Sequence, residues 1–464
     1  MKKKGSNKKI RKKIVIGSTV LGIFLSNIFL NEYFCKNIKN EKNNNIFFCE
    51  KIYAKDSNNK KNKKNSHKIE ETVYSEGEND NNNNKWPSGI EIETPNAIVM
   101  DVNTGTILYE KNINERRYPA SITKILTTLL AVENCNLSEN VTFSREAVYK
   151  NEINASHIAR DEGEVITMEQ CLYATMLESA NECAYATAEH VGSKKGGDYT
   201  TFIDLMNKRA QKLGCKDTHF NNSNGMPDEQ HYTTAYDMAL IAKEAYQNEN
   251  FRKIMLTKKY TLPATNKHPE ETYLRNHHMM YYPKKTTKYL YDGCLGGKTG
   301  YTIAANATLV TYAKRNDMLL CCVVLNAKSP NHYLDTIKLF DYCFDNFKIL
   351  NVKDYEKKLK YKGKKVKYDL NSYINVPKTV DYKEVTSKFI KNNSKVELEY
   401  SYLGRKVGAI QIVQPKEKIK KAKTVNSNDN DDIIKWIIGA VVIILLTVTF
   451  RKMLAKKKNI IFED

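Results

Sequence analysis

The 464-residue sequence lacks the cysteine and histidine spacings that typically bind zinc. Its ten cysteines include no C-x-x-C pair, and no histidines stand at ligand distance from them. The adjacent His277 and His278 have no ligand-like partners in the sequence. We therefore expect no metal site and no cofactor. Most cysteines lie in apolar contexts, which favours buried thiols, and Cys321 and Cys322 should point to opposite faces of one strand.

The sequence also lacks the signatures of nucleic-acid binding. Lysine and arginine number 74 against 53 acidic residues, and the net charge is +21. The lysines are scattered among asparagines and tyrosines, and no zinc finger, basic zipper or RNA-recognition motif is present. The charge is therefore interpreted as an affinity for anionic surfaces, and we expect no nucleic-acid partner.

Long hydrophobic runs occur at only two places, one near each end. Basic residues precede an apolar run at 14–30, so residues 1–35 are interpreted as a signal peptide or signal anchor. A second run, from Ile433 to Phe450, is long enough to span a bilayer, and the basic residues after it predict a cytoplasmic tail at 451–464. A buried core helix is the alternative for 433–450. Together the two runs predict a membrane protein whose middle part is extracytoplasmic.

Composition divides the region between the two runs. Residues 36–87 are rich in Asn, Lys, Asp and Glu and should form a disordered linker. Residues 88–350 mix strand and helix patterns, including hairpins near Gly105 and at 315–317, and predict an α+β domain with an antiparallel sheet and a helical cluster. Apolar and charged residues alternate within 351–420, which predicts a small all-β domain. Residues 421–432 should form a short linker.

A serine and a lysine stand together at the start of an apolar helical pattern. In "YPASITKILTTLLAVE", Ser121 and Lys124 are three residues apart and would share one face of the first turn. A lysine becomes a useful base only when burial or nearby positive charge lowers its pKa. The pair by itself is also compatible with a solvated helix start, since Ser6 and Lys9 repeat the spacing in a polar stretch.

Two further short strings follow it in the chain. Ser179, Ala180 and Asn181 lie within or beside a predicted helix. The string from Lys298 to Gly300 begins a predicted strand, and the glycines around it leave the backbone open to a ligand. Alone, the first string could be a helix cap and the second a turn.

The order S-x-x-K, S-x-N, K-T-G resembles the active site shared by serine DD-peptidases and β-lactamases. The resemblance is strongest to the low-molecular-mass penicillin-binding proteins that act as D-alanyl-D-alanine carboxypeptidases, and it covers about residues 90–347. The resemblance implies the β-lactamase/DD-peptidase fold and a role in peptidoglycan biosynthesis and cell shape. It also implies pentapeptide stems as the substrate and covalent inhibition by β-lactams. A β module and a membrane anchor also follow the catalytic domain in that family.

The resemblance implies catalytic roles for four residues. Ser121 would be the nucleophile that forms an acyl-enzyme, and Lys124 the general base that takes its proton. Ser179 would pass a proton to the leaving amine. Asn181 would orient Lys124 and the substrate amide.

It also implies that the K-T-G strand binds the substrate. Lys298 and Thr299 would hold the terminal carboxylate, next to Gly300. The backbone N–H groups of Ser121 and Tyr301 would form the oxyanion hole. Relatives often add an arginine for the carboxylate, whereas this chain offers Lys328 and His332 in the corresponding stretch; that role is left unassigned.

Three alternatives remain open. A β-lactamase shares these motifs, but class A enzymes deacylate with a glutamate in an E-x-x-L-N string, and none lies between Asn181 and Lys298. A DD-endopeptidase or transpeptidase would differ only in the shape of its cleft. A catalytically silent wall-binding module is disfavoured because every position of the three motifs is filled.

Overall fold

The computed structural model describes residues 86–150, 155–284, 286–392, 395–413 and 428–459. The expected signal segment at 1–35 lies outside the described residues, as does the expected linker apart from its last two positions. Most of the second linker, at 421–432, and the end of the tail also lie outside them.

A five-stranded antiparallel sheet lies at the centre of the first folded region, with the strand order β2-β1-β9-β8-β7. Its strands are β1 (Asn96–Asp101), β2 (Ile107–Lys111), β7 (Cys294–Thr302), β8 (Asn306–Arg315) and β9 (Met318–Ala327). The predicted hairpins are confirmed: β1 pairs with β2 across Gly105, and β8 turns into β9 with Arg315 opposite Met318. β7 is an edge strand, so one side of its backbone is free of strand partners in the sheet.

The two faces of the sheet are buried against different helices. Cys321 packs into the larger core, which the helical cluster covers, whereas Cys322 packs into a second core with α9 (Asn331–Asn346). The prediction that the two thiols point to opposite faces is therefore confirmed. The eight cysteines in the described residues are free thiols, and five of them are buried.

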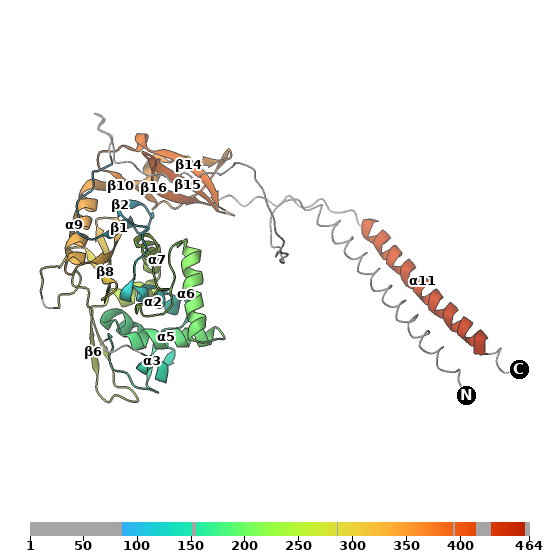
Figure 1. Ribbon diagram of the computed structural model, residues 1–464. Helices are drawn as coiled ribbons and strands as arrows, with labels where there is room; N and C mark the ends of the chain where they lie inside the picture. Colours follow the sequence, from blue (N-terminus) through green and yellow to red (C-terminus); the bar gives the residue numbers. More distant parts are fainter. Residues whose placement is uncertain (1–85, 151–154, 285, 393–394, 414–427, 460–464) are drawn as a thin grey trace, which may run out of the picture. The chain divides into compact units, whose positions relative to one another are not determined.

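The helical cluster is formed by the part of the chain that connects β2 to β7, as the colours of Figure 1 show. Its helices are α2 (Lys124–Asn134), α3 (Arg145–Tyr149), α4 (Met168–Tyr173), α5 (Asn181–Lys194), α6 (Tyr199–Leu213), α7 (Ala235–Gln247) and α8 (Glu249–Met255). Two short hairpins accompany them: β3 (Asn140–Thr142) with β4 (Val165–Thr167), and β5 (Lys259–Leu262) with β6 (Thr272–Arg275). Local sequence fixes several helix starts, since Thr167 and Asp198 each form a capping box.

The second folded region is all β apart from two short helical turns, and it has its own core. Its elements are β10 (Phe347–Asn351), α10 (Val352–Tyr355), β11 (Lys360–Tyr361), β12 (Lys364–Lys365), β13 (Tyr373–Pro377), η3 (Tyr382–Glu384), β14 (Thr386–Asn392), β15 (Lys395–Tyr402) and β16 (Arg405–Ile412). β10 pairs with β13, so the strand pairing of this region starts at Phe347. The boundary at 350/351 stays a prediction.

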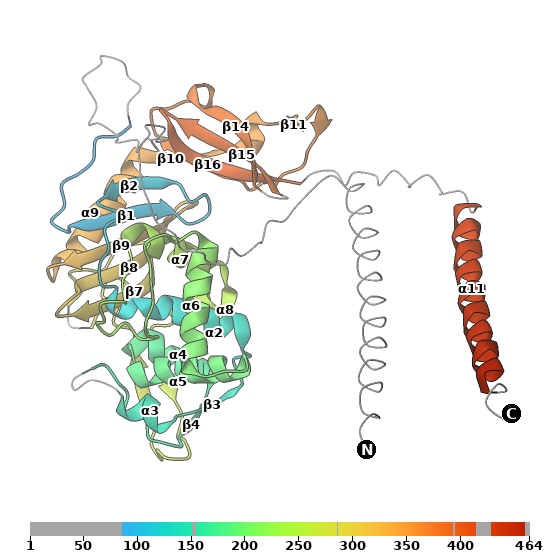
Figure 2. The same ribbon diagram turned by 45° about the vertical axis from the view of Figure 1, so that its right-hand side comes forward.

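One further helix, α11 (Asn428–Asn459), follows near the end of the chain, in red in Figure 2. Its segment Lys435–Met453 has a mean hydropathy of 1.9 and is the one helix among the described residues that is long and apolar enough to cross a membrane. None of that segment is buried within the protein. The observation is consistent with the span predicted at 433–450 and does not fix its orientation.

Candidate active site

The predicted nucleophile lies in a tight turn that leads into the central helix. The turn η1 (Ala120–Thr123) follows Pro119 and continues directly into α2, whose first residue is Lys124. Ala120 has a φ of 51°, a conformation that L-residues rarely adopt. The resulting geometry brings Lys124 Nζ to 3.1 Å from Ser121 Oγ.

Lys124 is completely buried, and its other two hydrogen bonds go to neutral oxygens. Nζ donates to Oδ1 of Asn181 at 2.7 Å and to the backbone carbonyl of Asn224 at 2.6 Å. Burial holds the pKa of Lys124 well below its ordinary value, and the charge of Lys298 lowers it further, while Glu182 acts in the opposite direction. The site therefore favours a neutral amine at this position.

The S-x-N string forms a break between two helices. The π-turn η2 (Ala174–Glu178) ends at Ser179, which adopts the left-handed conformation with φ 61° and ψ 27°. α5 then starts at Asn181, whose backbone N–H donates to the carbonyl of Ser156. Ser179 Oγ is buried and has no hydrogen-bond partner among the described protein atoms. A buried hydroxyl without a partner is unusual and is consistent with a group that awaits a ligand.

The K-T-G string lies on the edge strand β7. Lys298 is buried, and its Nζ donates to the carbonyl of Thr299 at 2.9 Å. Burial lowers the pKa of Lys298 to about 7, partly offset by the charge of Glu178. Thr299 is half-buried, and Tyr301 exposes its side chain while its backbone pairs with Ala307.

Gly300 shows how closely β7 approaches the nucleophile. A Cβ added at Gly300 would lie 2.9 Å from the backbone nitrogen of Ser121 and 2.3 Å from Oγ1 of Thr308. That hydroxyl donates to the carbonyl of Pro119, which ties the sheet to the turn η1. Only glycine fits here without displacing backbone, and this brings the backbones of Ser121 and the K-T-G strand together.

All eight residues predicted for the site thus lie in one region, on three separate elements: η1 with α2, the η2–α5 break, and β7. The hydrogen bond from Lys124 to Asn181 links the first two of these elements, and the close approach at Gly300 links the third. Their predicted roles are not tested by this geometry.

Sequence reasoning assigned no site role to the loop that carries Asn224 and Gly225. Gly225 has a φ of +91°, and a Cβ there would lie 1.9 Å from the carbonyl oxygen of Ala120. His231 continues this support, since its Nε2 lies 2.9 Å from Oγ1 of Thr123, and burial lowers its pKa to about 3. The Asn-Gly dipeptide at 224–225 is a turn signal that could have drawn attention to the loop.

The two residues of the stretch whose role was left unassigned, Lys328 and His332, lie in different environments. Lys328 is exposed, and His332 is buried against the ring of Tyr333. Burial lowers the pKa of His332 to about 4. His277 and His278 serve separate contacts, with Glu178 and with Thr311.

Comparison with known proteins identifies relatives for this region. Residues 81–329 match the family described as D-alanyl-D-alanine carboxypeptidase, peptidase S11. The chain is 34% identical over 272 residues to the D-alanyl-D-alanine carboxypeptidase DacF of Bacillus subtilis, covering 57% of this chain and 65% of the relative. It is 33% identical to a D-alanyl-D-alanine carboxypeptidase of Streptomyces strain K15, covering 53% of this chain and 85% of the relative. The chain thus spans just under two thirds of the length of the Bacillus relative.

Solved structures agree with the fold. The crystal structure of the Streptomyces K15 DD-transpeptidase aligns with a TM-score of 0.52 at 31% identity and covers 56% of this chain and all of that one. The D-alanyl-D-alanine carboxypeptidase DacD of Francisella tularensis aligns with a TM-score of 0.55 at 24% identity, covering 70% and 94%.

The predicted fold class and the resemblance read from the three motifs are therefore confirmed. The family match covers more than half of the chain and contains all three motif strings. This chain belongs to the D-alanyl-D-alanine carboxypeptidase family of serine peptidases, peptidase S11.

Proposed function

We propose that this protein is a serine DD-carboxypeptidase that removes the terminal D-Ala from peptidoglycan pentapeptide stems through an acyl-enzyme on Ser121. The observation that carries the proposal is the buried Lys124, whose Nζ lies 3.1 Å from Ser121 Oγ with no carboxylate among its hydrogen-bond partners. Family membership supports it, since relatives in Bacillus and Streptomyces carry this activity in their names.

The partners of Lys124 suit a general base. A neutral amine has two N–H groups and one lone pair, whereas an ammonium has three N–H groups. The oxygens of Asn181 and Asn224 can only accept, so they occupy the two N–H groups. The lone pair of the neutral amine then points to the third partner, the Ser121 hydroxyl, which can donate. Lys124 would therefore take the serine proton as Oγ bonds to the substrate carbonyl carbon.

Ser179 and Asn181 would complete the proton path. The C–N bond of the scissile peptide breaks when the leaving D-Ala amine receives a proton, and the unpartnered Ser179 hydroxyl could relay it from Lys124. Asn181 holds Lys124 through Oδ1, and its Nδ2 donates one N–H to Sδ of Met226 at 3.5 Å, so its second N–H would serve the substrate. Water then hydrolyses the ester on Ser121 by the same groups.

The edge strand β7 would bind the stem. A strand edge offers backbone donors and acceptors to an extended peptide. The N–H groups of Ser121 and Tyr301 would stabilise the oxyanion, each donor contributing roughly 3 kcal/mol in the transition state. Lys298 and Thr299 would bind the terminal carboxylate, Lys298 in its protonated form. β-Lactams would acylate Ser121 in the same way.

The apolar helix supports a proposal about localisation. α11 would anchor the protein in the cell membrane, with the folded regions outside and the tail after Phe450 in the cytoplasm, because basic residues follow the span. Protease added to cells stripped of their wall should digest the folded regions and spare an epitope tag at the C-terminus. Digestion of the tag would contradict this orientation.

The nucleophile is tested with the full-length protein in detergent and a fluorescent penicillin. We expect stoichiometric covalent labelling, and a labelled peptide that contains Ser121. Ser121→Ala should lose the label, whereas Ser144→Ala, at a helix cap outside the site, should keep it. A folded Ser121→Ala protein that still takes up the label would refute the assignment.

A second candidate, DD-transpeptidation, is favoured by the likeness to the Streptomyces K15 protein, whose crystal structure is named as that of a DD-transpeptidase. Both reactions share the acyl-enzyme and differ in whether water or an amine attacks it. Incubating the protein with pentapeptide and glycine, followed by mass spectrometry, separates them. Mostly tetrapeptide supports the carboxypeptidase, and mostly glycine adduct supports the transpeptidase.

The β-lactamase alternative predicts the opposite balance of rates. Without a dedicated deacylating glutamate, the penicilloyl ester should persist, since the bound leaving group blocks water. We expect D-Ala release from pentapeptide and penicillin hydrolysis slower by at least about a thousandfold, or roughly 4 kcal/mol in barrier. Rapid penicillin hydrolysis without D-Ala release would decide for the β-lactamase.

A further inference from the structure

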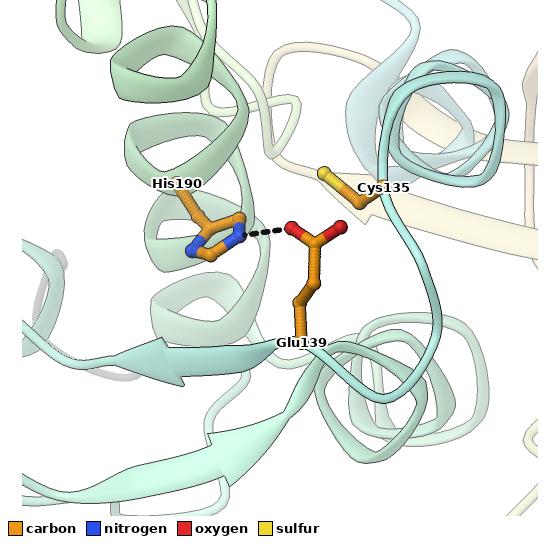
Figure 3. A group of neighbouring side chains, drawn as sticks. All are labelled: Cys135, Glu139 and His190. Carbon is orange, nitrogen blue, oxygen red and sulfur yellow. Dashed lines mark hydrogen bonds and ion pairs between the residues drawn. The ribbon is translucent and has the colours of Figure 1, made fainter.

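Three side chains of different chemistry converge at the C-terminal ends of α2 and α5, whereas Lys124 and Asn181 lie at the N-terminal ends of these helices. Cys135 is the C-cap of α2, Glu139 immediately precedes β3, and His190 lies in the last turns of α5. Figure 3 shows that the three side chains point toward one another, and their ligand atoms all lie within 4.8 Å of each other. Among the described residues this is the one group of three Cys, His or acidic side chains with such spacing.

The donor set matches zinc. Thiolate, imidazole and carboxylate are the three side-chain ligands that Zn²⁺ uses, and bonds of 2.0–2.3 Å in a tetrahedron place ligand atoms about 3.3–3.8 Å apart. Nε2 of His190 and Oε2 of Glu139 are already 3.0 Å apart. Small rotations of half-buried side chains would therefore bring all three atoms onto one ion.

The surroundings partly prepare these ligands. The other oxygen of Glu139, Oε1, accepts the backbone N–H of Asn136, which fixes the orientation of the carboxylate. Cys135 lies at a helix C-terminus, where unpaired carbonyls favour a cation. Two features oppose binding. Burial, together with Glu139, raises the pKa of the Cys135 thiol to about 11, and Lys194 forms an ion pair with Oε1 of Glu139, although its side chain is 41% exposed and free to move outward.

We propose that Cys135, Glu139 and His190 form a structural zinc site, with water as the fourth ligand. Binding replaces the Cys135 thiol proton, which leaves to solvent, by the metal. The ion would join the C-terminal ends of α2 and α5, the two helices whose first residues are Lys124 and Asn181. Sequence spacing did not reveal it, because His190 is 55 positions from Cys135 and the cysteine has no C-x-x-C partner.

The test uses the full-length protein in detergent, reduced and freed of metal. Titration with Co²⁺ should saturate at one equivalent and give the near-ultraviolet charge-transfer band of a cobalt thiolate, and Zn²⁺ should displace the cobalt. Cys135→Ser should abolish the band, and His190→Gln should weaken Co²⁺ binding at least about tenfold. Cys215→Ser is the matched control: this half-buried thiol bonds a backbone carbonyl elsewhere and should leave the titration unchanged.

Lys194→Met gives a sharper criterion, because removing the competing cation should tighten Co²⁺ binding several-fold. Fluorescent-penicillin labelling checks that each variant is folded. A cobalt-thiolate band that survives Cys135→Ser, the lack of saturable binding in the wild type, or weaker binding in Lys194→Met would overturn the proposal.

Discussion

The paired helices α2 and α5 carry lysines in opposite electrostatic states at their two ends. At the N-terminal ends, Lys124 is enclosed, bonded to neutral oxygens, and has a pKa far below its ordinary value. At the C-terminal ends, Lys194 lies on the surface and donates a hydrogen bond to Glu139, which raises the pKa of Lys194. The two side chains are chemically identical, so the difference comes entirely from their positions.

The comparison shows what makes a lysine a base. Desolvation penalises the ammonium, and a carboxylate partner would restore it. Glu182, the carboxyl group that acts against the lowering of the Lys124 pKa, is itself buried with a raised pKa, and its Oε1 accepts the backbone N–H of Ile158. Lys124 is thus denied an ion-pair partner, whereas Lys194 has one.

The largest expected contrast comes from replacing each of the two lysines, Lys124 and Lys194, by arginine. Lys124→Arg should reduce acylation by fluorescent penicillin by about 10²–10⁴-fold, because a guanidinium cannot lose its proton to become a base. Lys194→Arg should stay within about twofold of the wild type, since it keeps the surface ion pair. Stopped-flow labelling rates measure both. Equal losses in the two variants would contradict the comparison.

A second contrast concerns the close approach of β7. Gly300→Ala should reduce acylation about a hundredfold, since its Cβ would push on the Ser121 backbone nitrogen and displace the nucleophile. Gly89→Ala is the control, because its Cβ meets only Tyr109 at 3.7 Å. An acylation rate unchanged by Gly300→Ala would mean that η1 can shift without cost.

The pH profile of D-Ala release should separate the two buried lysines of the site. Activity should rise with pH as Lys124 loses its proton and fall as Lys298 becomes neutral, near its pKa of about 7. The two limbs belong to the coupled pair. In Lys298→Arg the falling limb of kcat/KM should move to higher pH, because arginine stays charged. If the falling limb does not move in Lys298→Arg, it reports the titration of a group other than Lys298.

The smallest effect is expected for Glu139, which lies near the C-terminal ends of α2 and α5. Glu139 has its pKa lowered to about 2 by its bonds to His190 and Lys194, so its stabilisation is present above an unfolded-state pKa near 4.5 and is lost as pH falls toward 2. In metal-free buffer, Glu139→Gln should lower Tm at pH 7 by less than about 4 °C, with acylation unchanged. The difference from the wild type should shrink between pH 6 and pH 3. A difference that grows on acidification would reverse the assigned sign.

Much of the fold was determined by local sequence. The apolar runs that form β8 and β9, with the turn between them, predicted the central hairpin, and the apolar periodicity after Ser121 predicted α2. The three motif strings identified the family because each combines residue types that rarely recur together in that order.

Other features of the site depend on contacts between distant segments. The carbonyl of Asn224, 100 positions from Lys124, was not predictable, since a backbone oxygen leaves no mark in residue identity. The close packing of Gly225 against the carbonyl of Ala120, which leaves no room for a Cβ, was not predictable either, since it joins segments far apart in the chain. The convergence of Cys135 and His190 was hidden for the same reason.

The sequence by itself determined the residue types of the candidate site, the antiparallel sheet with its helical cluster, and the apolar stretch that forms α11. Only the tertiary structure decided which lysines lose their solvent and which keep it. Burial and carboxylate partners depend on what packs around a side chain from elsewhere in the chain, and the pKa values of Lys124 and Lys194 depend on that packing.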